Sequence, residues 1–84
     1  MLENTTTSPI LLYGTSDCHL CEEAMYILKK HNISYEFIDI AHDNNLVDQL
    51  GWYIPVIKFQ DQLIKSPINW DEVIPEIQKQ QNNL

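Results

Sequence analysis

The stretch that decides the fold is Pro9–Cys21, with the sequence PILLYGTSDCHLC. Its apolar run stops at Gly14, which fits a strand buried on both faces over residues 9–14. Beyond Cys18, apolar residues recur at intervals of three and four positions, which predicts an amphipathic helix over residues 19–31, ended by Asn32. The two cysteines of this stretch therefore stand where a strand ends and a helix begins.

The rest of the chain predicts further strands and a short helix around this junction. Alternating residues predict a strand over 34–40, with either of its faces turned inward. Asp43 is expected to cap a short helix that ends at Gly51 in the left-handed conformation. Residues 56–59 and 63–65 are expected to form an antiparallel hairpin that reverses at residues 60–62.

A final amphipathic helix is predicted around Val73 and Ile77, and its start stays open between two positions. Asn69 followed by Glu72 resembles a capping box, which would start the helix directly after Asn69. A start near Asp71 would instead bring Pro75 into the first turn, where its missing amide does less harm.

The element order βαβ, short helix, ββ, helix predicts an α/β fold. Because a strand–helix–strand unit nearly always makes a right-handed crossover, the first two strands should be parallel neighbours. A four-stranded mixed sheet with helices on both faces then covers the apolar residues. We expect one domain over residues 9–80, a flexible tail at 1–8 and a frayed end at 81–84.

The net charge of the chain limits the classes of partner that it is expected to bind. Five lysines, no arginine and twelve acidic residues give a net charge of −7, which repels phosphate backbones and anionic lipid surfaces. Nucleic acid and membranes are therefore not expected as partners, and no apolar run is long enough to span a bilayer. The N-terminal residues lack the features of a signal peptide, so we expect the protein in the reducing cytoplasm. We also expect it to be a monomer.

The spacing of the cysteine pair suggests redox chemistry. Cys18 should cap the helix in an exposed position, where free amides of the first turn favour its thiolate. Cys21 shares a helix stripe with Ala24, Met25 and Leu28 and should be covered. One helical turn brings the two sulfurs within bonding distance, so an accessible nucleophile would stand beside a covered resolving thiol.

The stretch Tyr13–Ala24, with sequence YGTSDCHLCEEA, and the later Ile54-Pro55-Val56 resemble the short glutaredoxin-like proteins of the thioredoxin superfamily. The resemblance covers residues 9–80 and implies a thioredoxin-like, glutaredoxin-type fold with a redox-active disulfide that serves electron transport. It implies a cis peptide bond before Pro55 and backbone groups of Ile54 that bind an extended substrate. The residues between the cysteines, His19 and Leu20, would also face the substrate.

Departures from better-known glutaredoxins concern the glutathione site. No basic residue occurs over residues 13–17, and Ser66-Pro67 follows the fourth strand in place of a Gly-Gly turn. Asp17, Glu22 and Glu23 would repel glutathione, which is itself anionic. The same acids oppose a thiolate at Cys18, whereas the helix start favours it, and we expect the helix start to prevail.

We predict a dithiol thiol–disulfide oxidoreductase in which Cys18 attacks and Cys21 resolves. Its substrate would be a disulfide-containing protein or a small thiol compound, with no dissociable cofactor and with glutathione as one possible reductant. One alternative is a non-catalytic adaptor that holds a peptide near Pro55. Another is a zinc site of Cys18, Cys21, His31 and His42, although the histidines lack close spacing.

The aromatic residues of the second half allow more than one interpretation. Trp52 and Tyr53 lie close to Pro55 in the sequence. They could line a substrate groove or pack on the short helix, because either ring can bury apolar area and keep a polar tip accessible. Trp70 is expected to pack near the last helix.

Overall fold

The computed structural model describes residues 10–81 and confirms the predicted order of elements. A single 3-10 turn, η1, is added between the second strand and the short helix. In chain order the elements are β1 (Leu11–Gly14), α1 (His19–Lys30), β2 (Glu36–Asp39), η1 (Ile40–His42), α2 (Asn44–Leu50), β3 (Val56–Phe59), β4 (Gln62–Lys65) and α3 (Trp70–Gln81).

The four strands form one mixed sheet in the order β2-β1-β3-β4. Strands β1 and β2 are parallel and are joined through α1, whereas β3 pairs antiparallel with both β1 and β4. The predicted parallel unit and the predicted hairpin are thus confirmed. Strand β1 pairs along both edges, and its Leu12 and Gly14 are buried, whereas Leu11 and Tyr13 on the other face are partly buried.

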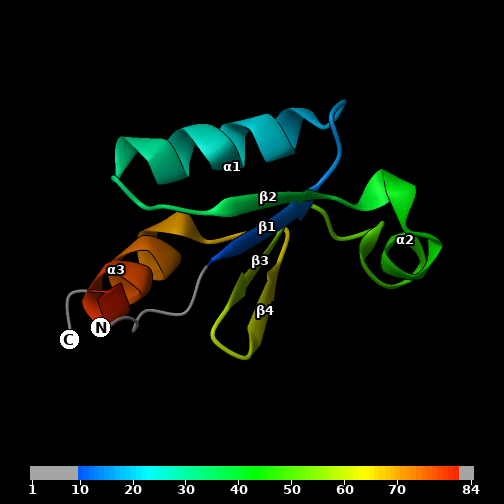
Figure 1. Cartoon of the computed structure of the whole chain (residues 1–84). Coiled ribbons are helices and arrows are strands. Elements are labelled where there is room, and N and C mark those ends of the chain that lie inside the picture. Colours follow the sequence, from blue (N-terminus) through cyan, green and yellow to red (C-terminus); the bar gives the residue numbers. More distant parts are fainter. Residues whose placement is uncertain (1–9, 82–84) are drawn as a thin grey trace, which may run out of the picture.

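Helices cover both faces of this sheet. Buried residues of α1 and α3 share one core cluster with strand residues such as Leu12 and Ile57. The shorter α2 packs through Leu50 against Val56 on the opposite face. In Figure 1, α1 runs alongside the sheet, and α2 and α3 lie at opposite ends of it.

Strand β2 presents Phe37 to the larger core cluster, and Tyr35 just before the strand packs there as well. The sequence left this inner face open because Glu36 and Ile38 alternate with the aromatic residues. The structure resolves the ambiguity in favour of the aromatic face, which α1 covers.

Both ends of helix α1 are capped by local hydrogen bonds. Cys18 is its N-cap, as predicted. At the other end Asn32 has a left-handed backbone (φ 59°), Asn32 N–H donates to the Lys29 carbonyl, and Ile33 N–H donates to the Leu28 carbonyl. These two bonds form a Schellman motif, in which a left-handed residue lets the chain satisfy the last helical carbonyls. Ile33 then enters the core beside Leu28.

The prediction of a left-handed Gly51 is wrong. Its φ is −54°, in the right-handed region, and its N–H still donates to the Val47 carbonyl. The chain continues to coil, because Tyr53 N–H donates to the Leu50 carbonyl at 2.8 Å. The predicted cap at the other end of α2 is confirmed, since Asp43 Oδ1 accepts from the next helical amides.

Two boundaries differ slightly from those predicted. The hairpin reverses over Gln60 and Asp61 alone, with Gln60 left-handed (φ 57°), and Gln62 already pairs with Phe59. Helix α3 begins at Trp70, and the Asn69 carbonyl accepts from the amides of the first turn. The start after Asn69 is therefore the correct alternative.

Pro75 lies inside α3 and is exposed. A proline there cannot donate to the carbonyl four residues earlier. Residues 1–8, expected as a tail, lie outside the described residues, as do residues 82–84, whereas Gln81 still belongs to α3. Within residues 10–81, no helix combines the length and apolarity needed to cross a membrane.

Candidate active site at the start of α1

The two cysteines form a disulfide across the first turn of α1, with their Cα atoms 5.1 Å apart. Cys21 is fully buried, whereas Cys18 is partly exposed. The Cys21 N–H donates to Cys18 Sγ at 3.0 Å. Cys18 is thus less open than the sequence suggested, but it is the cysteine that solvent reaches.

Burial of Cys21 follows from its place on α1 and from Gly14. Ala24 and Leu28 continue its stripe into the core. A Cβ added to Gly14 would lie 2.6 Å from Cys21 Sγ and 3.2 Å from the Phe37 ring. Because a real Cβ does not fit at such a distance, the end of β1 accommodates the buried sulfur only as glycine. The sequence marked Gly14 only as the end of an apolar run.

The segment before β3 carries the cis proline that the resemblance implied. The Ile54–Pro55 bond is cis, and Pro55 is buried. Just before it, the Tyr53 carbonyl accepts from Ser66 N–H at 3.0 Å, which ties the chain after β4 to this loop. In the part of the chain that the structure describes, no hydrogen bond engages the backbone of Ile54.

A second cis bond, Ser66–Pro67, was not predicted. It lies in a segment that forms one wall of a groove of about 190 Å³ beside the first turn of α1. Residues 66–70, which follow β4, contain no glycine, and their sequence did not indicate that they would line a groove. The groove is lined by Leu20, Glu23, Pro55, Ser66, Pro67, Ile68 and Trp70.

Two of the four predicted substrate-binding residues, Leu20 and Pro55, meet in this groove. His19 is exposed but outside the lining. Ile54 is partly buried and packs against the smaller core cluster instead. Trp70 packs on the core as expected and is also a groove wall, which the sequence did not suggest.

The two aromatic residues shortly before Pro55, Trp52 and Tyr53, lie in different surroundings. Trp52 is 92% exposed and lies over α2, where it lines a shallow hollow with Val47 and Asp48. Tyr53 lies under the Lys65 ammonium, whose Nζ is 4.6 Å from the ring centroid. Neither residue lines the groove beside the cysteines.

Acidic side chains dominate the surroundings of the disulfide. Asp17, Glu22 and Glu23 are all exposed around the first turn of α1. Carboxylates near a helix N-terminus interact favourably with the helix dipole, and they also repel anionic ligands. Among residues 10–81, no three His, Cys, Asp or Glu side chains gather where they could hold one metal ion. His42 lies instead within 3.9 Å of Asp39.

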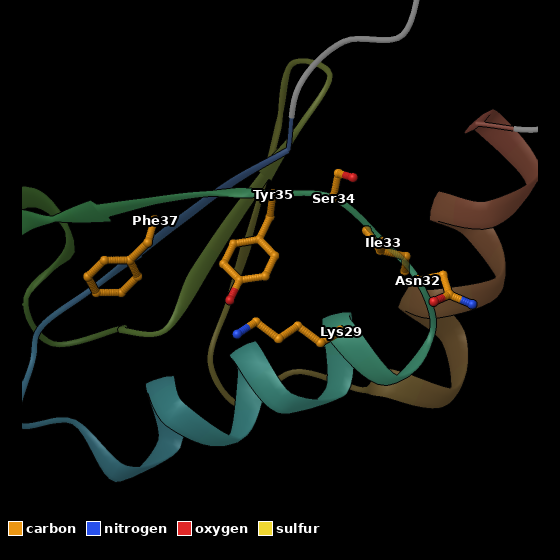
Figure 2. A pocket seen from close by; sticks show the side chains of 6 residues that line it. All are labelled: Lys29, Asn32, Ile33, Ser34, Tyr35 and Phe37. Carbon is orange, nitrogen blue, oxygen red and sulfur yellow. The ribbon is translucent and has the colours of Figure 1, made fainter.

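A larger hollow, of about 630 Å³, lies at the other end of α1. Figure 2 shows Tyr35 and Phe37 of the β2 segment pointing toward α1, with the Lys29 side chain extending toward the Tyr35 hydroxyl. No cysteine and no acidic group lines this hollow. It is wide open to solvent and does not touch the disulfide.

The sheet order, the helices on both faces, the Cys-x-x-Cys disulfide at the start of α1 and the cis proline before β3 together define a thioredoxin-like fold. The profile described as "Glutaredoxin-like domain (DUF836)" matches residues 9–78. The chain therefore belongs to this glutaredoxin-like family.

The fold is also similar to that of a solved structure. The solution NMR structure of protein Ne2328 from Nitrosomonas europaea superposes with a TM-score of 0.66 at 23% sequence identity. The similarity covers 90% of this chain and 98% of that one. No curated protein matches the sequence significantly.

Proposed function

We propose that this protein is a dithiol thiol–disulfide oxidoreductase. The observation that carries the proposal is the asymmetry of the cysteine pair, with Cys18 reachable at the helix cap and Cys21 buried one turn later. Membership of the glutaredoxin-like family supports a thiol redox role.

Local electrostatics support Cys18 as the nucleophile. In the reduced protein, the Cys21 N–H is placed to donate to a thiolate at Cys18, as it donates to Cys18 Sγ in the disulfide. The partial positive charge at the start of the twelve-residue α1 acts in the same direction. The nearby carboxylates act against it, but they are exposed and therefore screened by solvent.

The exchange proceeds in two balanced steps. The Cys18 thiolate attacks one sulfur of the substrate disulfide, which forms a mixed disulfide and releases the other substrate sulfur as a thiolate. Cys21 then loses its proton and attacks Cys18, which forms the Cys18–Cys21 disulfide and releases the second substrate thiolate. The substrate gains two electrons and, from solvent, two protons. A thiol or dithiol reductant in the cytoplasm restores the pair.

The cis-proline loop supplies a surface for the substrate backbone. Because the described residues leave the Ile54 backbone without a hydrogen bond, an extended segment can pair with it next to the disulfide. Main-chain pairing of this kind gives affinity without demanding a particular side chain. This surface would serve equally in a non-catalytic adaptor, so the chemistry must be tested directly.

The test measures reduction of a disulfide-bonded peptide by the prereduced protein, with Cys18→Ser and Cys21→Ser as variants. We expect Cys18→Ser to abolish reduction and Cys21→Ser to accumulate a mixed disulfide at Cys18, detected by mass spectrometry. Peptide binding that is equal in all three proteins without any reduction would contradict the proposal and identify an adaptor. Stoichiometric metal in the purified protein, lost in both variants, would contradict it as well.

A further inference from the structure

The groove beside the first turn of α1 combines apolar walls with a single charged side chain. Leu20 of α1 and Trp70 of α3 both line it, together with Pro55 and Pro67, the two prolines that follow cis peptide bonds. Of the seven lining residues only Glu23 is charged, and its side chain is exposed. Such a surface suits a side chain that has an apolar stem and a positive head.

The acidic residues next to the lining residues in the sequence have the same sign of charge as Glu23 in the groove. Glu22 on α1 and Asp71 at the start of α3 are exposed acidic neighbours in sequence of the lining residues Glu23 and Trp70. The cation nearest in sequence is Lys65, and its ammonium lies over the Tyr53 ring, outside the lining. A negatively charged ligand would therefore meet the Glu23 carboxylate and no cation among the lining residues.

We infer that this groove binds a lysine or arginine side chain that lies close in sequence to the attacked cysteine of a disulfide-bonded polypeptide. The inference rests on the proposed function and names its substrate class. The alkyl stem of such a residue packs along Leu20 and the face of Trp70, while its cationic head meets the Glu23 carboxylate. The groove adds binding energy only, and the two exchange steps are unchanged.

The expected size of this preference follows from the exposure of Glu23. An exposed ion pair changes an equilibrium or a transition-state affinity by a factor of about 1.5 to 5. We therefore expect kcat/KM to rise by about 1.5- to fivefold when a neutral residue beside the substrate cysteine is replaced by lysine. A glutamate at the same place should lower it by a similar factor.

The experiment uses three peptides that share one internal disulfide and differ only in the residue beside one cysteine, which is Lys, Gln or Glu. Each is reduced by the prereduced full-length protein at low and high salt. The wild-type protein should reduce the Lys peptide fastest and the Glu peptide slowest. Because a salt concentration near 1 M shortens the screening length to about 3 Å, the differences should shrink there.

Variants at two adjacent glutamates locate the effect. Glu23→Gln should remove most of the preference and Glu23→Lys should reverse it. Glu22→Gln and Glu22→Lys make the same charge changes in the same helical turn but outside the groove lining, so they should keep the order Lys, Gln, Glu.

Two results would overturn the inference. One is equal reduction of all three peptides by the wild-type protein. The other is an equal effect of the Glu22 and Glu23 variants, which would reveal a diffuse acidic field in place of a binding groove. Failure of the proposed function gives a different result, because then none of the three peptides would be reduced by any variant.

Discussion

The two ends of α1 differ in what they contain. At the start of the helix lie the disulfide, exposed carboxylates and a groove of about 190 Å³. At the end of the helix lie Lys29, the Asn32 turn and a hollow of about 630 Å³. No cysteine lines the larger space, whereas the smaller one is lined by Leu20, which lies between the two cysteines in the first turn of α1. Chemistry and exposure, and not volume, identify the candidate site.

The first prediction concerns the core beneath the C-terminal half of α1, where the largest effect on stability is expected. Leu28 of α1 is fully buried in the larger core cluster, which also contains residues of the sheet and of α3. Leu28→Ala should lower the free energy of unfolding by about 2–5 kcal/mol, through lost transfer energy and the cavity it leaves. Denaturant unfolding measures this. A loss below about 1 kcal/mol would mean that the helix is not anchored there.

The second prediction concerns the N-terminal end, where Gly14 touches Cys21. Gly14→Ala places a methyl group 2.6 Å from Cys21 Sγ, so the sulfur or β1 must move. We expect the oxidised protein to lose about 1–3 kcal/mol of stability, the usual cost of overpacking. We also expect the mixed disulfide to persist longer, because Cys21 is the resolving thiol. Unchanged stability and unchanged resolution would show that the close approach has no role.

The third prediction tests the turn that ends α1. Asn32 adopts a left-handed backbone, which asparagine tolerates better than alanine does. Asn32→Ala should therefore cost about 1 kcal/mol, and the matched Asn32→Gly should cost little or nothing. Thermal or denaturant unfolding separates the two. Equal losses in both variants would point to the Asn32 side chain, and not to its backbone conformation.

The smallest effect is expected at the larger hollow. Lys29→Ala and Tyr35→Phe change the two polar groups that extend toward each other in Figure 2. Disulfide reduction should keep its wild-type rate in both variants, because neither residue lines the groove beside the disulfide. A loss of turnover in either variant, with the fold intact, would contradict the separation of the two ends.

The sequence predicted those parts of the molecule that depend on local spacing. The cap at Cys18 and the burial of Cys21 follow from residues within one turn of α1 and from its apolar stripe. The cap at Asp43 rests on a similarly local pattern. The parallel pairing of β1 with β2 joins distant residues, but the order strand–helix–strand predicts it through the handedness of such a crossover.

The sequence did not predict the parts that depend on contacts between distant segments. The groove joins Leu20 to Trp70, and these residues meet only once the sheet has formed. The cis bond before Pro67 lies in the same wall, and a Ser-Pro pair by itself favours the trans form. The expectation of a left-handed glycine after α2 was also wrong for Gly51, because the chain continues to coil toward Tyr53 after the helix ends.

The most direct test of the central claim compares the two thiols of the reduced protein. Brief treatment with iodoacetamide near neutral pH, followed by site-resolved mass spectrometry, gives the alkylation rate of each cysteine. We expect Cys18 to react faster than Cys21 by about tenfold or more, because Cys18 is reachable and its thiolate is favoured. Equal rates, or faster reaction at Cys21, would contradict the assignment of nucleophile and resolving thiol.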